Sequence, residues 1–383
     1  MPTPSPGRPG PASSAPAGRG TAADEALSLR NEALSALDAG SPAWALRLSA
    51  QALDAIEAGG LRGGLDDAAV LIAHAEIEEA LDRFGDAAVT IATAIAILSE
   101  AVTDDPDDDC VTLWCQAQER MAGLERLAGD FGAATARLTA VLDRASAALG
   151  EESLAVASAA SALGVAHKGA SDFDAAEAAY QRAAAAAAAM ADPDPLLEAG
   201  LLHNLGGLAH ARGDAATGIP LAERGASVRA EALGPDHPDV ARDLNALGAL
   251  YHLAGRHDDA ERAYARALAV FEDRYGPGHF EVAMACANLC VLRTDQGDYG
   301  QAESLGRRSP DIFTAVLGPD DAEVGLTLLN LAPVAAGRGN RVEAGDLASR
   351  AARILAGRLP DGHPHVVAAA RAVQRYGRRA DAP

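Results

Sequence analysis

Residues 233–276 read LGPDHPDVARDLNALGALYHLAGRHDDAERAYARALAVFEDRYG, and this stretch decides the fold. Its opening pair recurs on a strict spacing of 42 residues, with a degenerate copy near Ala191; the recurrences are Leu149-Gly150, Leu233-Gly234, Tyr275-Gly276, Leu317-Gly318 and Leu359-Pro360. A fixed period of about 20 to 50 residues is typical of stacked supersecondary units. We therefore expect one continuous array of repeats.

Each unit is predicted to be a pair of helices. Asp236 or His237 can cap the first helix, and Pro238 suits its first turn, where no backbone donor is needed. Gly255 ends this helix, and a second helix runs over about 257–274. Apolar residues recur at the helical spacings of three and four, namely Val240, Leu244, Leu247, Gly248 and Tyr251, then Ala260, Tyr264, Ala267 and Phe271.

These residues resemble a known family. Leu244, Leu247, Gly248, Tyr251, Ala260, Tyr264 and Ala267 are similar to the tetratricopeptide repeat signature, and 233–241 with Leu244-Asn245 resembles the 42-residue variant typified by kinesin light chains. The resemblance implies an all-α, right-handed superhelical solenoid. It also implies that Gly248 and Ala260 are small so that two helices can touch, while Tyr264 fills the gap to the next repeat.

The resemblance covers most of the chain and divides it into five parts. Residues 1–21 are a Pro-, Gly- and Ala-rich leader that we expect to be disordered. Degenerate hairpins follow over 22–148, and the regular array occupies 149–358. A capping helix covers 359–377, and 378–383 form a tail. The fold class is therefore all-α, with about eight helical hairpins and a C-terminal capping helix.

Composition and charge limit the classes of partner that the protein is expected to bind. The net charge of −22 argues against nucleic acid. From Ala335 onward nine Arg face four acidic residues, which suggests head-to-tail self-association or, more simply, an uneven solvated surface. No run of about 18 apolar residues is evident, so no membrane span is expected. Four clustered cysteines are too few for a disulfide framework, which indicates a reducing cytoplasm.

The resemblance implies a peptide groove on the concave side, lined by the first helix of each hairpin. In the family, Asn at two groove positions holds an extended peptide backbone, and an amide can both donate and accept. The matching residues are Asn31, Asn204, Asn245, Asn288 and Asn330, with Arg242, His203, His210, His252 and Lys168 nearby. The alternative is that these Asn cap or cross-link neighbouring helices.

Charge in this groove is expected to vary along the array. Only Arg242 fits the family's clamp for a C-terminal carboxylate, so that type of chaperone receptor is not supported. The mild positive character of the central repeats favours a ligand with some acid. Around Glu76, Glu79 and Glu119 the groove should instead prefer a basic segment.

Residues suited to catalysis or metal binding are explained more simply by structure. The run Asp104–Asp109 is an acidic loop between repeats, with adventitious Ca²⁺ or Mg²⁺ as the alternative. Cys286 and Cys290 are expected to pack in the core. His237, His279 and His363 recur at one place in their units, which indicates helix starts. Neither a cofactor nor a metal is expected, and no enzyme motif is present.

The sequence favours a non-catalytic cytoplasmic scaffold that binds a peptide or disordered segment of a partner protein. A regulatory sensor that changes pitch on binding a peptide is the second hypothesis, and an enzyme or accessory subunit of unrecognised kind is the third. Whether the groove holds a partner or the chain's own leader stays open. Hinges for the sensor would be Gly206, Gly207, Gly218, Gly225, Pro220, Pro310 and Pro333.

Overall fold

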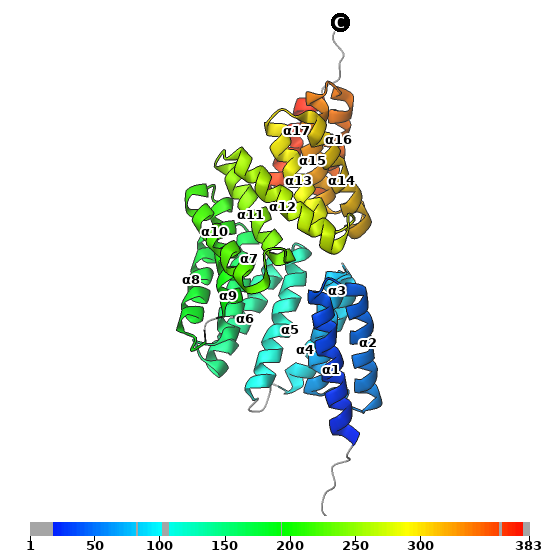
Figure 1. Cartoon of the computed structure of the whole chain (residues 1–383), viewed down its shortest axis with the longest axis vertical. Coiled ribbons are helices and arrows are strands. Elements are labelled where there is room, and N and C mark those ends of the chain that lie inside the picture. The colour runs from blue at the N-terminus through cyan, green and yellow to red at the C-terminus, as the bar shows by residue number, and fades with distance from the viewer. Residues whose placement is uncertain (1–17, 82, 102–106, 193, 360–361, 378–383) are drawn as a thin grey trace, which may run out of the picture. The chain divides into compact units, whose positions relative to one another are not determined.

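The structure is a computed structural model that describes residues 18–81, 83–101, 107–192, 194–359 and 362–377. Every regular element among these residues is an α-helix, which confirms the all-α class (Figure 1). The helices are α1 (Gly18–Asp38), α2 (Pro42–Ala58), α3 (Leu65–Ala80), α4 (Phe84–Ala101), α5 (Asp108–Leu127), α6 (Phe131–Leu149), α7 (Leu154–Gly169), α8 (Phe173–Ala189), α9 (Pro195–Ala211), α10 (Ala215–Leu233), α11 (Pro238–Leu253), α12 (His257–Tyr275), α13 (Phe280–Asp295), α14 (Tyr299–Leu317), α15 (Ala322–Gly337), α16 (Arg341–Arg358) and α17 (Pro364–Tyr376).

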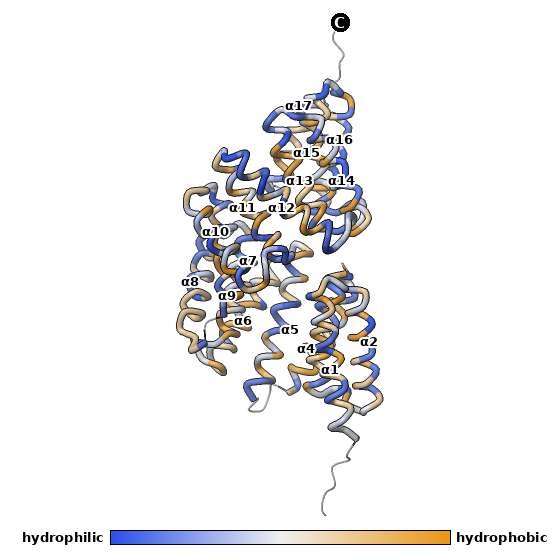
Figure 2. Tube along the Cα trace, in the orientation of Figure 1, coloured by the Kyte–Doolittle hydropathy of each residue, from blue (hydrophilic) through white to orange (hydrophobic). Residues whose placement is uncertain are grey.

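The helices follow one another as eight pairs and a closing helix. Pairs such as α7 with α8, α11 with α12 and α15 with α16 pack together, and α17 packs on α15 and α16. The tube in Figure 2 alternates between apolar and polar colours along the helices, as expected where each helix buries one side. The predicted hairpins and the predicted C-terminal capping helix are thus present.

The contacts divide the chain into two compact units, residues 1–117 and residues 118–383, with the boundary inside α5. In the first unit, Ala26 and Ala33 of α1 pack against α2 and α3, where Ile56 and Ile77 are fully buried. Small residues on α1 let the three helices approach closely. The second unit holds the regular repeats and the predicted groove.

The predicted leader ends earlier than expected. Residues 18–21 form the first turn of α1 instead of belonging to the leader. Pro16 is the last proline of that stretch, so nothing downstream of it interrupts helical hydrogen bonding. Residues 1–17 and the predicted tail, 378–383, lie outside the described part of the chain.

By length and composition alone, one described helix is long and apolar enough to cross a membrane. This helix is α4, whose 18 residues include only two acidic side chains, Asp86 and Glu100. Its Ile91 and Leu98 are fully buried, and Thr90 donates a 2.7 Å hydrogen bond to Glu78 of α3. Within the first unit α4 therefore packs as the second helix of a hairpin.

The second helices keep one spacing. The starts of α6, α8, α10, α12, α14 and α16 are each 42 residues apart, which is compatible with the predicted repeat. The turn before these helices needs a left-handed residue, and Gly213 and Gly255 supply it with φ of 75° and 73°. At the equivalent place in an earlier hairpin stands Ser171, with φ of 62°, the one non-glycine residue of positive φ in the described ranges.

The two helices of a hairpin meet where a ring covers a glycine. A Cβ atom on Gly248 of α11 would lie 2.7 Å from Cδ1 of Tyr264 on α12, and Tyr180 covers Gly164 in the same way. The ring of Tyr264 also packs against Leu289 and Leu292 of the next hairpin. The aromatic residue thus fills the gap to the next repeat, as predicted, and seals its own hairpin as well.

Glycines at irregular repeats make room for larger neighbours. Gly218 of α10 faces the side chain of Leu250, and Gly306 of α14 faces Leu331 and the sulfur of Cys290. Helices α10, α14 and α15 continue through Pro220, Pro310 and Pro333. Gly218, Gly306 and Pro310 are buried inside these continuous helices, whereas Pro220 is exposed.

The cysteine pair lies in the core, as predicted. Cys286 and Cys290 of α13 are fully buried, and both are free thiols. Burial raises the pKa of each thiol to about 11. Both side chains therefore behave as small apolar residues.

Substituting Gly248→Ala should destabilise the protein, because the new methyl group would displace the Tyr264 ring. We expect a net loss of about 1 to 2 kcal/mol, after allowing for the better helix propensity of alanine. Gly200→Ala is the matched control, since a Cβ at this helical position in α9 meets nothing within 4 Å. It should gain up to about 1 kcal/mol in the same urea denaturation measurements. Equal effects of the two substitutions would contradict the ring-on-glycine contact.

Substituting Ser171→Gly should stabilise the protein by about 0.5 to 1 kcal/mol, because it relieves a left-handed backbone at a residue with a Cβ atom. Ala170→Gly in the same turn is the control. Its φ of −74° is ordinary, so the added flexibility should only destabilise. Thermal unfolding of both variants measures the difference, and a lower melting temperature for Ser171→Gly would disprove strain at this turn.

Candidate functional site

The candidate site is the face formed by the first helices of the second unit, called here the first-helix face. Helices α7, α9, α11, α13 and α15 each contact the next member of this series. Among the described helices, α8, α10, α12, α14 and α16 make no corresponding contacts with one another. First helices therefore lie closer together than second helices, which places them on the inner side of the array.

Three of the predicted amides cross-link neighbouring first helices. Asn204 of α9 donates a 3.1 Å hydrogen bond to the hydroxyl of Ser161 on α7. Asn288 of α13 donates one of the same length to Oδ1 of Asn245 on α11. All four side chains are half-buried. This is the cross-linking that the alternative interpretation predicts, and whether the amides also hold a peptide stays a prediction.

The remaining predicted amides are arranged differently. Asn330 of α15 is half-buried, and its side chain forms no hydrogen bond within the described ranges. Asn31 lies on α1 in the first unit, where Arg30 donates to its Oδ1 at 2.9 Å. The predicted ladder of Asn residues is therefore confined to α9, α11, α13 and α15.

Several predicted cationic residues are already paired with carboxylates. Arg242 donates from Nε to Glu281 at 2.6 Å and also pairs with Asp239. Burial alone would lower the pKa of Arg242, but the charge of Glu281 and its hydrogen bond raise it. His252 lies 2.9 Å from Asp295. These pairs leave Arg242 and His252 with little charge to offer a ligand.

His203 belongs to a buried ion network. Its Nδ1 lies 2.8 Å from Asp243, whose side chain is only 3% exposed. Arg229 of α10 donates from Nε to the other carboxylate oxygen at 2.7 Å. A buried carboxylate needs such partners, so His203 has a structural role between α9, α10 and α11.

Two neighbouring basic side chains lack such partners. Lys168 of α7 and His210 of α9 form no ion pair with any described carboxylate. Burial lowers the pKa of Lys168, and the charge of Arg126 lowers it further. Burial also lowers the pKa of His210, with further lowering by Lys168 and His252. The charged form of His210 is therefore disfavoured beside Lys168.

Arg126 was missed by the sequence reasoning. It lies in the last turn of α5, half-buried, and burial lowers its pKa while the Tyr180 hydroxyl group raises it. Tyr180 is fully buried, and its hydroxyl has no hydrogen-bond partner among the described atoms. The signal was present in the sequence, because Arg126 precedes Lys168 by one 42-residue period.

The acidic part of the predicted groove is divided between the two units. Glu76 and Glu79 lie on α3 in the first unit, whereas Glu119 belongs to the second. Ser158 of α7 donates a 2.6 Å hydrogen bond to Glu119. Burial raises the pKa of Glu119 to about 7, against smaller lowering effects from Ser158 and Arg120. Near neutral pH this carboxyl group therefore carries only part of its charge.

The recurrent histidines act at helix starts, as predicted. Nδ1 of His237 accepts a 3.2 Å hydrogen bond from the backbone of Asp239, and His279 accepts one of equal length from Glu281. His363 caps α17 in the same manner. No group of three or more metal-ligating side chains occurs among the described residues. Residues 104–106 of the predicted acidic loop lie outside the described part of the chain, whereas Asp108 and Asp109 form the first turn of α5. Asp107 accepts from the backbone of Cys110 at 2.8 Å.

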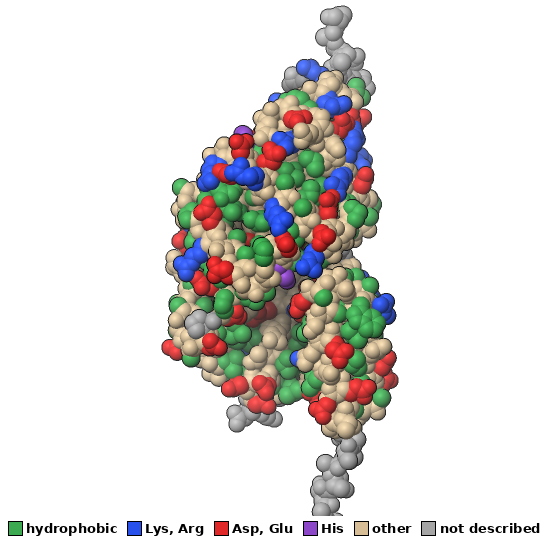
Figure 3. All heavy atoms as spheres, viewed as in Figure 1, with side chains coloured by type: hydrophobic (Ala, Val, Ile, Leu, Met, Phe, Trp, Pro, Cys, Tyr) green, Lys and Arg blue, Asp and Glu red, His purple; other side chains and the backbone are tan. Residues whose placement is uncertain are grey.

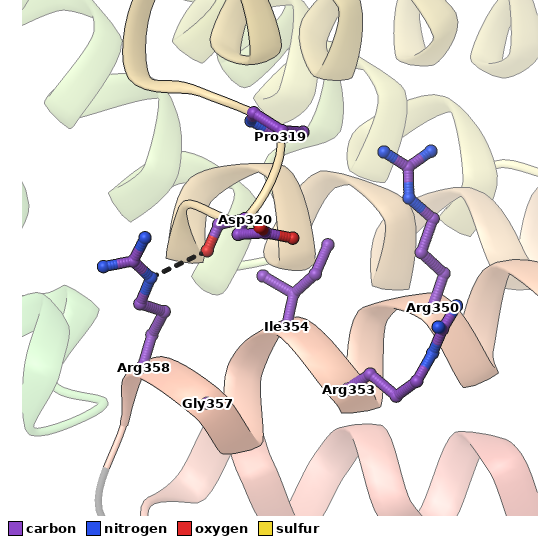
Figure 4. Close-up of a pocket in the computed structure, with 7 residues that line it drawn as sticks. All are labelled: Pro319, Asp320, Arg350, Arg353, Ile354, Gly357 and Arg358. Atoms are coloured by element: carbon purple, nitrogen blue, oxygen red, sulfur yellow. Dashed lines mark hydrogen bonds between the residues drawn. The ribbon is translucent and has the colours of Figure 1, made fainter.

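The surface of the C-terminal repeats carries many paired charges. Figure 3 shows basic and acidic side chains beside one another on these repeats, and Arg307 pairs with both Glu303 and Glu343. An open cavity of about 450 Å³ lies between α16 and the α14–α15 turn (Figure 4). Arg350 and Arg353 extend into solvent there, and Arg358 donates to the backbone oxygen of Asp320 at 2.9 Å. Head-to-tail self-association through this basic end stays a prediction.

Comparisons with known proteins agree with this architecture. Residues 197–273 match the model of the tetratricopeptide repeat family. A Rap protein complexed with competence and sporulation factor aligns over 92% of this chain and 97% of its own, with 13% identity and a TM-score of 0.57. The apo form of RapI aligns over 81% and 86%, with 12% identity and a TM-score of 0.51. BtubC (BKLC) from P. vanneervenii is 24% identical over 62% of this chain and 94% of its own, with a TM-score of 0.47. The sequence matches none of the curated proteins compared.

Substituting Glu119→Gln should make stability less dependent on pH. The folded-state pKa of Glu119 is raised to about 7, so its contribution is present below about pH 4.5 and is lost as the pH rises through 7. The variant should therefore gain on the wild type by up to about 3 kcal/mol between pH 5 and pH 8. Urea denaturation at both pH values measures this, with the exposed Glu152→Gln as control. A constant difference would contradict the burial of this carboxyl group.

Proposed function

We propose that this chain, a tetratricopeptide-repeat protein, is a non-catalytic cytoplasmic scaffold that binds a peptide or disordered segment of a partner protein on its first-helix face. The repeat match and the helical-solenoid neighbours support a protein-interaction scaffold. The observation that carries the proposal is the row of half-buried amides, Asn204, Asn245, Asn288 and Asn330, along successive first helices. The free, buried thiols fit a reducing compartment.

The Asn side chains would bind the peptide backbone through the donors and acceptors that are not already used in the cross-links. Asn204 uses one amide hydrogen on Ser161, so its second hydrogen and its oxygen stay available. Asn288 likewise keeps its oxygen, and Asn245 keeps its NH₂ group. An extended peptide presents alternating donors and acceptors, which such amides can satisfy in either direction. The cross-links also fix the amide rotamers in advance, which lowers the entropy lost on binding.

No observation favours the sensor hypothesis over the scaffold. Its proposed hinges lie inside continuous helices, and Gly218 and Gly225 are in close contact with Leu250 and Leu202. Opening such contacts would expose apolar side chains. One of the Rap structures was solved with competence and sporulation factor bound, and at 13% identity this likeness concerns the fold alone.

The double substitution Asn204→Ala and Asn288→Ala should weaken peptide binding while leaving the array folded. We expect a loss of about tenfold or more in affinity, because two paired backbone contacts disappear. The measurement is selection of unstructured dodecapeptides from a displayed library on the wild type, followed by titration of the enriched peptides on both proteins. Circular dichroism verifies the fold.

The matched control removes two amides from the second helices, Gln181→Ala with Gln301→Ala, both exposed. These substitutions should leave binding unchanged. Peptides that bind the Asn variant as well as the wild type would refute backbone capture by the amide row. A library that yields no enriched peptide would refute peptide binding itself.

A further inference from the structure

The second helices of the second unit carry an arginine at one recurring position. It stands in α8, α10, α12, α14 and α16 at intervals of 42 residues, as Arg182, Arg224, Arg266, Arg308 and Arg350. The first four each form an ion pair with a carboxylate, in order those of Glu151, Glu198, Asp236 and Glu272. Arg350 forms no ion pair with any described residue. The last repeat therefore lacks a pairing that the other four keep.

Two cavities occupy this same place in different repeats. A cavity of about 300 Å³ lies between α12 and the turn that precedes α11. The cavity of about 450 Å³ between α16 and the α14–α15 turn is lined by residues two 42-residue periods further along the chain. The corresponding pairs are Asp236 with Asp320, Arg266 with Arg350, and Arg274 with Arg358.

Two of the corresponding positions differ in charge between the cavities. Arg353 stands where the smaller cavity has Ala269, and Gly357 stands where it has Asp273. The smaller cavity therefore has two arginines against two aspartates, whereas the larger has three arginines against one aspartate, a net charge of +2. Because the smaller cavity balances its own charge, it serves as an internal reference for the larger one.

The arginines of the larger cavity lie around an apolar floor. Figure 4 shows Arg358 at one end, Arg350 and Arg353 at the other, and the buried Ile354 between them. Nε of Arg358 donates to the backbone oxygen of Asp320 at 2.9 Å, which holds this guanidinium group at the edge of the cavity. Arg350 and Arg353 are three residues apart on α16, so they are neighbours on its surface. None of the three arginines forms an ion pair with a described carboxylate.

We propose that Arg350, Arg353 and Arg358 form a binding site for a phosphoryl group, carried by a small phosphate ester or by a phosphorylated side chain. A phosphate monoester has a charge of about −1.5 to −2 near neutral pH, which matches the net charge of +2 in this cavity. Guanidinium groups bind phosphoryl oxygens through paired, charge-assisted hydrogen bonds. A second helix and a turn form the site, so it is separate from the first-helix face and independent of peptide binding there.

Each cavity can be given the charges of the other, and this exchange tests the site. Arg353→Ala with Gly357→Asp gives the larger cavity the residues of the smaller, and a Cβ atom at Gly357 meets nothing within 4 Å. Calorimetric titration with phenyl phosphate should detect one site on the wild type and at least tenfold weaker binding to this variant. The reciprocal variant, Ala269→Arg with Asp273→Gly, should gain a second site beside α12.

Arg262→Ala, on the exposed surface of α12, is the control for removal of one charge and should bind phenyl phosphate as the wild type does. Unchanged binding to the variant with Arg353→Ala and Gly357→Asp would overturn the proposal, as would the absence of a second site in the reciprocal variant. The arginines could instead only complement the C-terminal end of α16. In that case the first variant loses thermal stability and the wild type binds no phenyl phosphate, which also overturns the site.

Further probes distinguish the class and the source of the ligand. Succinate should bind at least tenfold more weakly than phenyl phosphate at the same ionic strength, because a phosphoryl group places three acceptor oxygens and about two charges at one point. Equal binding of succinate would overturn the preference for phosphoryl groups. A neutral hexapeptide with one phosphoserine represents a phosphorylated protein segment. Its tighter binding would support the site with a protein as the ligand, and tighter binding of phenyl phosphate would support it with a small ester.

Carboxylates of a second copy of the chain are the competing occupant of this cavity. Sedimentation velocity at low salt measures self-association of the wild type and of the variant with Arg353→Ala and Gly357→Asp. If only the wild type self-associates and phenyl phosphate binds to neither protein, the cavity is an interface between copies and the phosphoryl site is overturned. A wild type that binds phenyl phosphate and stays monomeric supports the site.

Discussion

The contact between a glycine on the first helix and an aromatic ring on the second sets the geometry of the second unit. Tyr264 over Gly248 and Tyr180 over Gly164 bring two backbones closer than any pair of larger side chains would allow. Each ring also reaches the next hairpin, through Leu289 and Leu292 in one case and Leu208 in the other. One glycine and one tyrosine thus set both the distance between the two helices of a hairpin and the packing of that hairpin on the next. The polar residues on the first-helix face then take their places as a consequence of that stacking.

On this face the polar side chains fall into two groups. Most are satisfied inside the protein: Asn204 by Ser161, Asp243 by Arg229 and His203, and Arg242 by Glu281. A face whose polar groups are mutually satisfied is rigid and needs no ligand to be stable. The second group consists of Arg126 and Lys168, which form no ion pair with any described carboxylate.

The sequence predicted the fold well because the decisive contacts are short in range and repeat. Each turn glycine, helix-start histidine and Gly–Tyr pair lies within a single unit. Because these patterns recur in several units, each feature is easier to recognise in the sequence. The site was predicted less completely, since a side chain on one first helix meets its partner about 40 residues away. That Asn288 would bond Asn245, or that Glu281 would engage Arg242, depends on stacking details. Arg126 was missed because it lies in a degenerate repeat.

Unequal packing on the two sides of the second unit has a mechanical consequence. First helices contact one another in series, whereas each second helix is held by its own hairpin and the next first helix. Pulling on the two ends of such a stack would separate the outer edge first, while the inner edge acts as the pivot. The second unit would therefore stretch most easily along the edge formed by the second helices. A molecule bound along the first helices would lie on the edge whose length changes least.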